Sequence, residues 1–151
     1  MTSPQRTAQS ATPTYVDPGQ AGTAASSVVD VSKTAATEQA DFSVLDNIGF
    51  APCYQAYAQS MLPYAASASP FNSVTVTSIP VSTPTNPAVK AVEYQIARTA
   101  ASSTVTTTAL AVSGGRILAT LTLNSTGTFP ATTTSALLTA VEGRVAGAAT
   151  Q

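Results

Sequence analysis

The side chains of this chain that could carry out chemistry are seven carboxylates, one thiol and a group of aromatic rings. Its 151 residues include no histidine and no tryptophan, and 9% of them are charged. Histidine is the usual general base near neutral pH and the commonest metal ligand. Without it, catalysis would require paired carboxylates or a thiolate held next to a cation.

The spacing of these residues indicates neither arrangement. Asp41 and Asp46 are five positions apart near an expected helix start, where an aspartate normally caps the helix. Cys53 has Lys33 and Lys90 as its nearest basic residues in sequence, so we expect a small buried side chain rather than a reactive thiolate. We therefore predict that the chain is not an enzyme and holds neither a cofactor nor a metal.

Aromatic residues concentrate in one stretch of the chain. Tyrosine offers a large apolar area together with a hydroxyl group, which suits both helix packing and a binding surface. The stretch is therefore interpreted either as a helix packed on a sheet or as an aromatic-lined cleft or partner surface. The residues that would form this ligand or partner surface are Phe50, Tyr54, Tyr57, Tyr64 and Phe71.

Charge and hydropathy narrow the class of partner. The net charge is −1 and the basic residues are scattered, so electrostatic binding to nucleic acid is not expected. Apolar runs fall well short of the roughly 20 residues that a membrane-spanning helix needs. The segment 1–20 lacks the basic start and apolar stretch of a signal peptide. The expected partner is a protein or an apolar small molecule, and a homo-oligomer remains open.

Composition divides the chain near residue 41. Residues 1–40 are rich in Thr, Ser, Ala, Gln and Pro, with one apolar cluster formed by Val28, Val29 and Val31. Such a segment buries too little surface to offset its ordering entropy. We expect a disordered arm, or one that orders only against a partner, followed by a single domain over residues 41–151.

Helical spacing begins at Asp41 and continues to about residue 66. The pattern predicts two short helices joined near Gly49 and Pro52, with Pro52 in the first turn of the second helix and Pro63 ending or kinking it. The apolar stripe expected on the second helix is Cys53, Tyr57, Met61 and Leu62.

Alternating patterns then predict four strands, at about 74–79, 89–98, 104–112 and 116–123. The turn Ser113-Gly114-Gly115 joins the last two as a hairpin, because glycine accepts positive φ. A closing helix is expected over 130–148, with Thr128 as N-cap and Pro130 in its first turn. Its stripe of Leu137, Leu138, Val141 and Val145 would pack on the hairpin.

Strands grouped between helices favour an α+β fold. The expected fold is an antiparallel sheet of about four strands, a meander with a Gly-Gly hairpin, packed against two short N-terminal helices and a C-terminal helix.

The segment from Val74 to Ala149 resembles the C-terminal half of actinobacterial exported domains. These occur in secreted lipoproteins and as extracytoplasmic sensor-like domains, including the outer domain of a mycobacterial serine/threonine kinase. The resemblance lies in the runs AVEYQIARTAASSTVTTTALAVSGGRILATLTLNS and SALLTAVEGRVAGAA. It implies an α+β fold, export, and a binding or sensing role. Members of that group often carry a cysteine pair, whereas this chain has Cys53 alone.

Two functional hypotheses follow. The first is a non-enzymatic exported binding or sensor-like domain, located in the cell envelope or secreted, that contacts an apolar ligand, an envelope component or a protein partner. The alternative is a structural subunit of a large assembly, such as a virion coat or decoration protein or a surface filament, with residues 1–40 as an inter-subunit arm.

Overall fold

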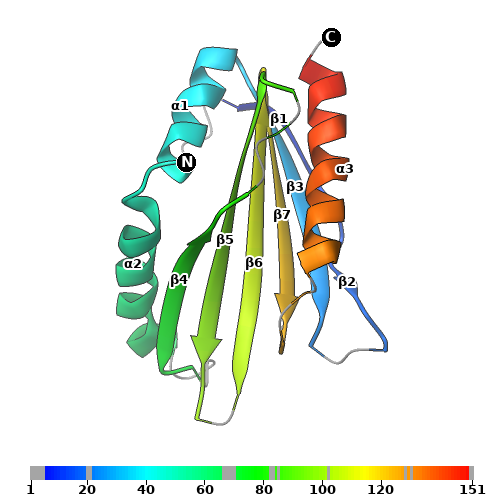
Figure 1. The fold of residues 1–151 in the computed structure, drawn as a ribbon. Coiled ribbons are helices and arrows are strands. Elements are labelled where there is room, and N and C mark those ends of the chain that lie inside the picture. Colours follow the sequence, from blue (N-terminus) through cyan, green and yellow to red (C-terminus); the bar gives the residue numbers. More distant parts are fainter. Residues whose placement is uncertain are drawn as a thin grey trace.

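A computed structural model gives the arrangement of residues 6–19, 22–65, 71–81, 84, 86–101, 103–127, 129 and 131–149, except for the side chains of residues 63–65 and 131. Seven strands form one antiparallel sheet and three helices pack against it (Figure 1). The elements are β1 Arg6–Ala11, β2 Tyr15–Val16, β3 Ala24–Ser32, α1 Ala35–Leu45, α2 Phe50–Ala65, β4 Ser73–Ile79, β5 Val89–Thr99, β6 Thr104–Gly114, β7 Ile117–Ser125 and α3 Ala131–Ala149.

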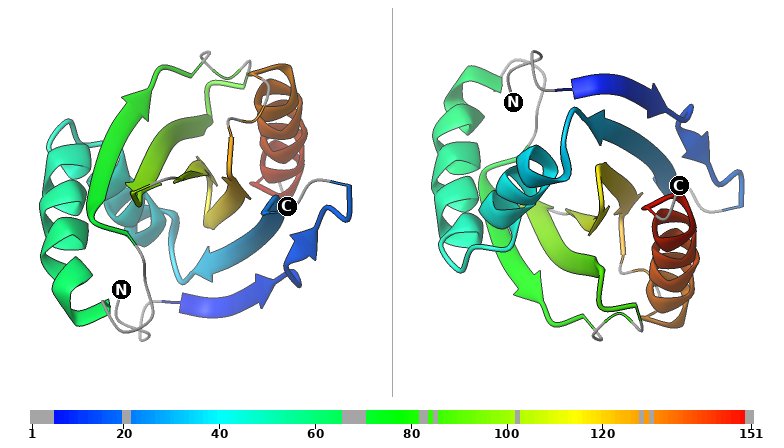
Figure 2. Two further views of the ribbon diagram at one scale, coloured as in Figure 1. Left: turned by 90° about the horizontal axis from the view of Figure 1, so that it is seen from below. Right: turned by 90° about the horizontal axis from the view of Figure 1, so that it is seen from above.

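The strand order is β1-β3-β7-β6-β5-β4, and the short β2 pairs with β3 beside β1. Seen along the strands, α1 and α2 lie on one side of the sheet and α3 on the other (Figure 2). Because side chains alternate along a strand, each central strand supplies residues to both sides. On β6, for example, Leu110 and Val112 pack in the cluster that includes α3, while Ala111 packs against Phe42 of α1.

The α+β class and the antiparallel sheet are confirmed, but the expected number of about four strands is too small. The four predicted strands correspond to β4–β7, and the other three come from the segment predicted to be an arm. There the prediction is wrong for the described residues, because β3 pairs with β7 over eight successive residue pairs from Ala24 to Val31. A strand needs the backbone of a neighbouring strand and one covered face, but it does not need an apolar core of its own. The polar composition of residues 1–40 was therefore a poor indicator of disorder.

The helices also differ in detail from their predictions. α1 begins six residues earlier than expected, and its N-cap is Thr34, whose hydroxyl accepts a hydrogen bond from the Thr37 backbone N–H at 3.1 Å. Asp46 is instead the C-cap residue. Pro52 lies in the first turn of α2 as predicted. Thr128 and Pro130, the predicted start of the last helix, lie outside the described residues.

The buried side of α2 agrees with the predicted stripe at Leu62 and differs from it elsewhere. Phe50, Tyr54, Ala58 and Leu62 pack against the cluster formed by Val74, Val76, Tyr94 and Ile96. Tyr57 and Met61 instead stay 60% and 43% exposed, and Cys53 is exposed. The residues that pack recur every four positions and begin with two aromatic rings. Cys53, Tyr57 and Met61 each lie one position before a residue that packs. The expected burial of Cys53 is therefore wrong.

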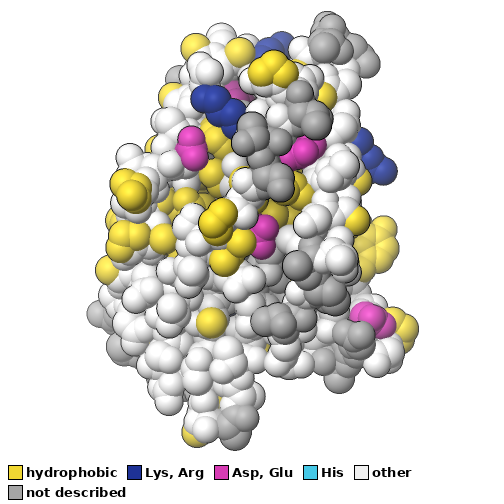
Figure 3. Space-filling view, viewed as in Figure 1, with side chains coloured by type: hydrophobic (Ala, Val, Ile, Leu, Met, Phe, Trp, Pro, Cys, Tyr) yellow, Lys and Arg dark blue, Asp and Glu magenta, His cyan; other side chains and the backbone are white. Residues whose placement is uncertain are grey.

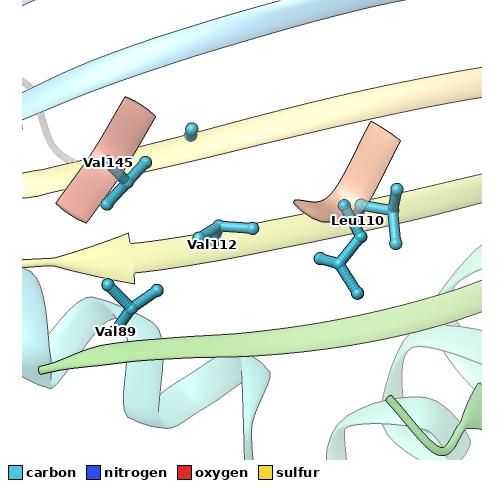
Figure 4. Packing of buried hydrophobic residues seen from close by; sticks show 6 residues of the cluster. Val89, Leu110, Val112 and Val145 are labelled. Carbon is cyan, nitrogen blue, oxygen red and sulfur yellow. The ribbon is translucent and has the colours of Figure 1, made fainter. Parts of the chain in front are cut away.

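On the opposite side, α3 packs on the hairpin as predicted. Val145 of α3 lies close to Val112 and Val89 in the strands beneath it (Figure 4). Gly114 allows this approach, because a Cβ atom at that position would lie 2.7 Å from the Val145 Cγ1 atom. Gly115 has φ of +59° at the first turn residue, a position that requires glycine in a type II′ turn.

The β4 edge of the sheet is closed by side chains of α2. The outward backbone N–H groups of Val74 and Val76 donate to the side-chain oxygens of Gln59 and Gln55, each at 2.9 Å. The two glutamines are four residues apart and so lie on one side of the helix. They occupy the hydrogen-bonding groups that would otherwise face a further strand.

Candidate functional site

A pocket lies between the α1–α2 pair and the sheet, and we call it the aromatic pocket. Its volume is about 280 Å³. Leu45 of α1 and Phe50 and Tyr54 of α2 form the helix side of its lining, and apolar residues of β4–β7 form most of the sheet side. The strand residues are Val76, Val92, Tyr94, Ile96, Ala109, Leu110, Ala111, Leu118 and Thr120, and Asp30 of β3 completes the lining.

Three rings make up the aromatic wall. Phe50 stacks on Tyr54 with ring centroids 5.7 Å apart and an interplanar angle of 11°, and it meets Tyr94 at 4.9 Å and 50°. Stacked and tilted ring pairs at these separations are favourable geometries. The rings therefore fix one another in place and present a preformed apolar surface.

Tyr94 joins the pocket to α1. Its ring is 7% exposed, and its hydroxyl donates a hydrogen bond to the backbone carbonyl of Leu45 in the last turn of α1. Burial, with a smaller contribution from the negative charge of Asp46, raises the pKa of the Tyr94 phenol. The neutral phenol is therefore favoured, which keeps it a hydrogen-bond donor that holds α1 over the sheet.

The carboxylate in the lining of the aromatic pocket is already paired. Asp30 Oδ1 accepts hydrogen bonds from Arg6 Nε at 3.0 Å and from Gln9 Nε2 at 2.8 Å, both on β1. The pairing neutralises the charge at this end of the pocket. The pocket is thus mainly apolar, with its charged group engaged on the side of β1.

A second polar anchor holds the first turn of α1. Glu38 is 2% exposed, and its Oε2 atom accepts a hydrogen bond of 2.6 Å from the Ser113 hydroxyl on β6. Its Oε1 atom has no hydrogen-bond partner among the described residues. Burial raises the pKa of Glu38 and the charge of Asp41 adds to the effect, whereas the Ser113 hydrogen bond and the charge of Lys90 oppose it.

The structure brings two of the five predicted surface residues into this pocket. Phe50 and Tyr54 line it, while Tyr57 contacts Tyr54 at a centroid distance of 6.4 Å but is largely exposed. Phe71 is partly buried outside the lining, and the side chain of Tyr64 lies outside the described residues. Sequence reasoning missed Tyr94 as a site residue, although it lies within the strand predicted at about 89–98.

The described residues contain no group of three or more His, Cys, Asp or Glu side chains that could hold a metal ion. None of the helices described is long and apolar enough to cross a membrane. What the geometry provides is an apolar volume with rigid walls.

Comparison of the chain with protein-family models, with curated proteins and with solved structures finds no match in any of the three.

Proposed function

We propose that this chain is a non-enzymatic binding domain that holds a neutral, apolar small molecule in the aromatic pocket. The observation that carries the proposal is the 280 Å³ volume walled by Phe50, Tyr54 and Tyr94. Binding pockets for small molecules are concave, mostly apolar and largely preformed, and this volume is near the lower end of their usual range. A compact ligand of one or two rings fits it best.

Electrostatics supports a neutral ligand. Burying a charge without a partner costs several kcal/mol, and Asp30 already has its counter-charge in Arg6. Tyr94 has its hydroxyl bound to Leu45. A ligand therefore gains mainly from burial of its apolar area and from contact with ring faces, which is worth roughly 0.5–1.5 kcal/mol per well-oriented aromatic pair.

A neutral fluorescent probe, N-phenyl-1-naphthylamine, tests the proposal. Ala109 lines the pocket, so Ala109→Leu fills part of the volume and is expected to weaken probe binding at least tenfold. The matched control is Ala97→Leu on β5, which is partly buried but lies outside the pocket and should leave binding unchanged. Denaturation curves of both variants show that the fold is retained. Equal affinity in all three proteins would refute the proposal.

We also propose an extracytoplasmic location, in the cell envelope or secreted, with the virion as the alternative. The low charge and the resemblance of residues 74–149 to exported actinobacterial domains support it. Fractionation of the source cells tests this directly. Recovery of the protein with the cytoplasmic fraction would contradict it.

A second candidate, a structural subunit of a large assembly, is favoured by the exposed apolar side chains of α1 and α2. Hydrophobic side chains appear on this side of the molecule in Figure 3. The exposed apolar side chains of this region are Val44 on α1, the 97% exposed Ile48 in the turn between the two helices, and Tyr57 and Met61 on α2. Size-exclusion chromatography with light scattering separates the two candidates: stable particles of many subunits support the assembly, and a monomer that binds the naphthylamine supports the binding domain.

A further inference from the structure

A second apolar hollow lies on the opposite face of the sheet, between α3 and strands β3 and β7. We call it the α3 groove. Its volume is about 260 Å³. Aliphatic side chains dominate its lining, notably Val29, Ile117, Leu121, Val141 and Val145, and none of the described lining residues is aromatic.

The groove exists because α3 covers only part of the sheet. The helix packs on β6 and β7 through Leu138 and Val145, but Val29 of β3 remains 36% exposed. Small residues, Ala119 below and Ala148 above, leave room between helix and strand. The result is a surface hollow rather than a closed cavity.

One cation lines this groove. Arg144 is exposed on α3, and among the described residues it has no hydrogen-bond or ion-pair partner. The other three arginines are all engaged: Arg6 with Asp30, Arg98 with the Thr107 hydroxyl, and Arg116 with the Ser32 carbonyl. A guanidinium offers up to five donors in a planar fork that matches a carboxylate.

We propose that the α3 groove binds a single-chain fatty acid, with the alkyl chain along the aliphatic lining and the carboxylate on Arg144. Charge complementarity selects the occupant, since the described residues of the groove lining include one cation and no acidic side chain. The aliphatic lining suits an alkyl chain better than a ring, and a volume of about 260 Å³ suits one chain better than a two-chain lipid. The site is separate from the aromatic pocket and does not depend on the function proposed for it.

Dodecanoate and dodecanol are the paired probes, measured by isothermal titration below their aggregation concentrations. Dodecanoate is expected to bind, and Arg144→Gln should weaken it about tenfold, as for the loss of a charge-assisted hydrogen-bond pair. The same variant should leave dodecanol affinity unchanged. Decanoate should bind about tenfold more weakly than dodecanoate because two methylenes are lost.

A steric variant tests the position of the chain. Ala148 is exposed on α3 and lines the groove, so Ala148→Phe should reduce the affinity for both probes. The matched control is Ala140→Phe, at another exposed position on α3 that does not line the groove. Ala109→Leu should leave dodecanoate binding unchanged, because it changes only the aromatic pocket.

Four results would overturn the proposal. The first is the absence of dodecanoate binding. The second is binding that neither Arg144→Gln nor Ala148→Phe weakens. The third is co-sedimentation with phosphatidylglycerol vesicles without binding of free dodecanoate, since that result would assign Arg144 to a membrane surface instead. Binding that Ala109→Leu removes and Ala148→Phe spares would also refute it, because the chain would then lie in the aromatic pocket.

Discussion

The two faces of the sheet are built from the same central strands, yet they differ in how their helices pack. On the α1–α2 face, rings and a buried carboxyl meet the strands, and a pocket remains among them. On the α3 face, the helix brings no aromatic residue, and its valines come close enough to require Gly114 beneath them. On the α3 face, small aliphatic side chains pack closely over β5 and β6, and the hollow lies farther out, over β3 and β7. On the α1–α2 face, the space lies beside the stacked rings themselves.

The largest change in stability is expected in the core under α3. Leu110 is 1% exposed and belongs to the cluster with Val112, Leu138 and Val145. Leu110→Ala should lower the free energy of unfolding by about 2–5 kcal/mol, because it leaves a cavity in a closely packed region. Urea denaturation measures the loss. The control, Ile48→Ala, should change stability by less than about 0.5 kcal/mol, and a similar small effect for Leu110→Ala would contradict close packing on this face.

A pair of glycines tests the closeness of α3 to the sheet. Gly114→Ala should destabilise by about 1–3 kcal/mol, because its Cβ would lie 2.7 Å from Val145. Gly143→Ala on α3 should have the opposite sign and stabilise by about 0.5–1 kcal/mol, since no atom lies within 4 Å of its Cβ and alanine favours helix. Thermal unfolding of the two variants measures the change in stability of each. Equal changes in the two variants would argue against a steric cause at Gly114.

On the other face, Tyr94→Phe removes the hydrogen bond to the Leu45 carbonyl but keeps the ring in the aromatic wall. The expected loss is about 1 kcal/mol. Amide hydrogen exchange should show faster opening of α1 than of α3. If the two helices opened equally, the hydroxyl would not be what holds α1 in place.

The smallest expected effect is a pH dependence at Glu38. Burial raises its pKa above the ordinary value of 4.5, so the folded protein holds this proton more tightly than the unfolded chain does. The resulting stabilisation is present below about pH 4.5 and is lost as the pH rises through the raised pKa.

Glu38→Gln should therefore reduce the decline in the free energy of unfolding that sets in as the pH rises above about 4.5. Glu93 and Glu142, whose pKa values burial also raises, keep part of the dependence in the variant. Denaturation at a series of pH values compares the two proteins. Identical slopes would mean that Glu38 titrates alike in the folded and unfolded states.

The sequence was informative wherever a pattern was local. The strands β4–β7, the glycine turn and the apolar stripe of α3 follow from alternation and helical spacing over short stretches. The strand β3 could not be predicted in this way, because it becomes ordered through β7, more than 80 residues away in sequence. For the same reason Phe50 and Tyr54 were found as aromatic residues, but the pocket was not. Its other walls come from strands that only the fold brings beside α2.

The two glutamines that cover β4 have a consequence for self-association. Strand addition can extend a sheet without limit only when both edges accept a new chain. Gln55 and Gln59 occupy the outward amides of Val74 and Val76, so a new strand would have to displace both side chains to pair with this part of β4. Replacement of both glutamines by alanine would free these amides for backbone pairing with another molecule.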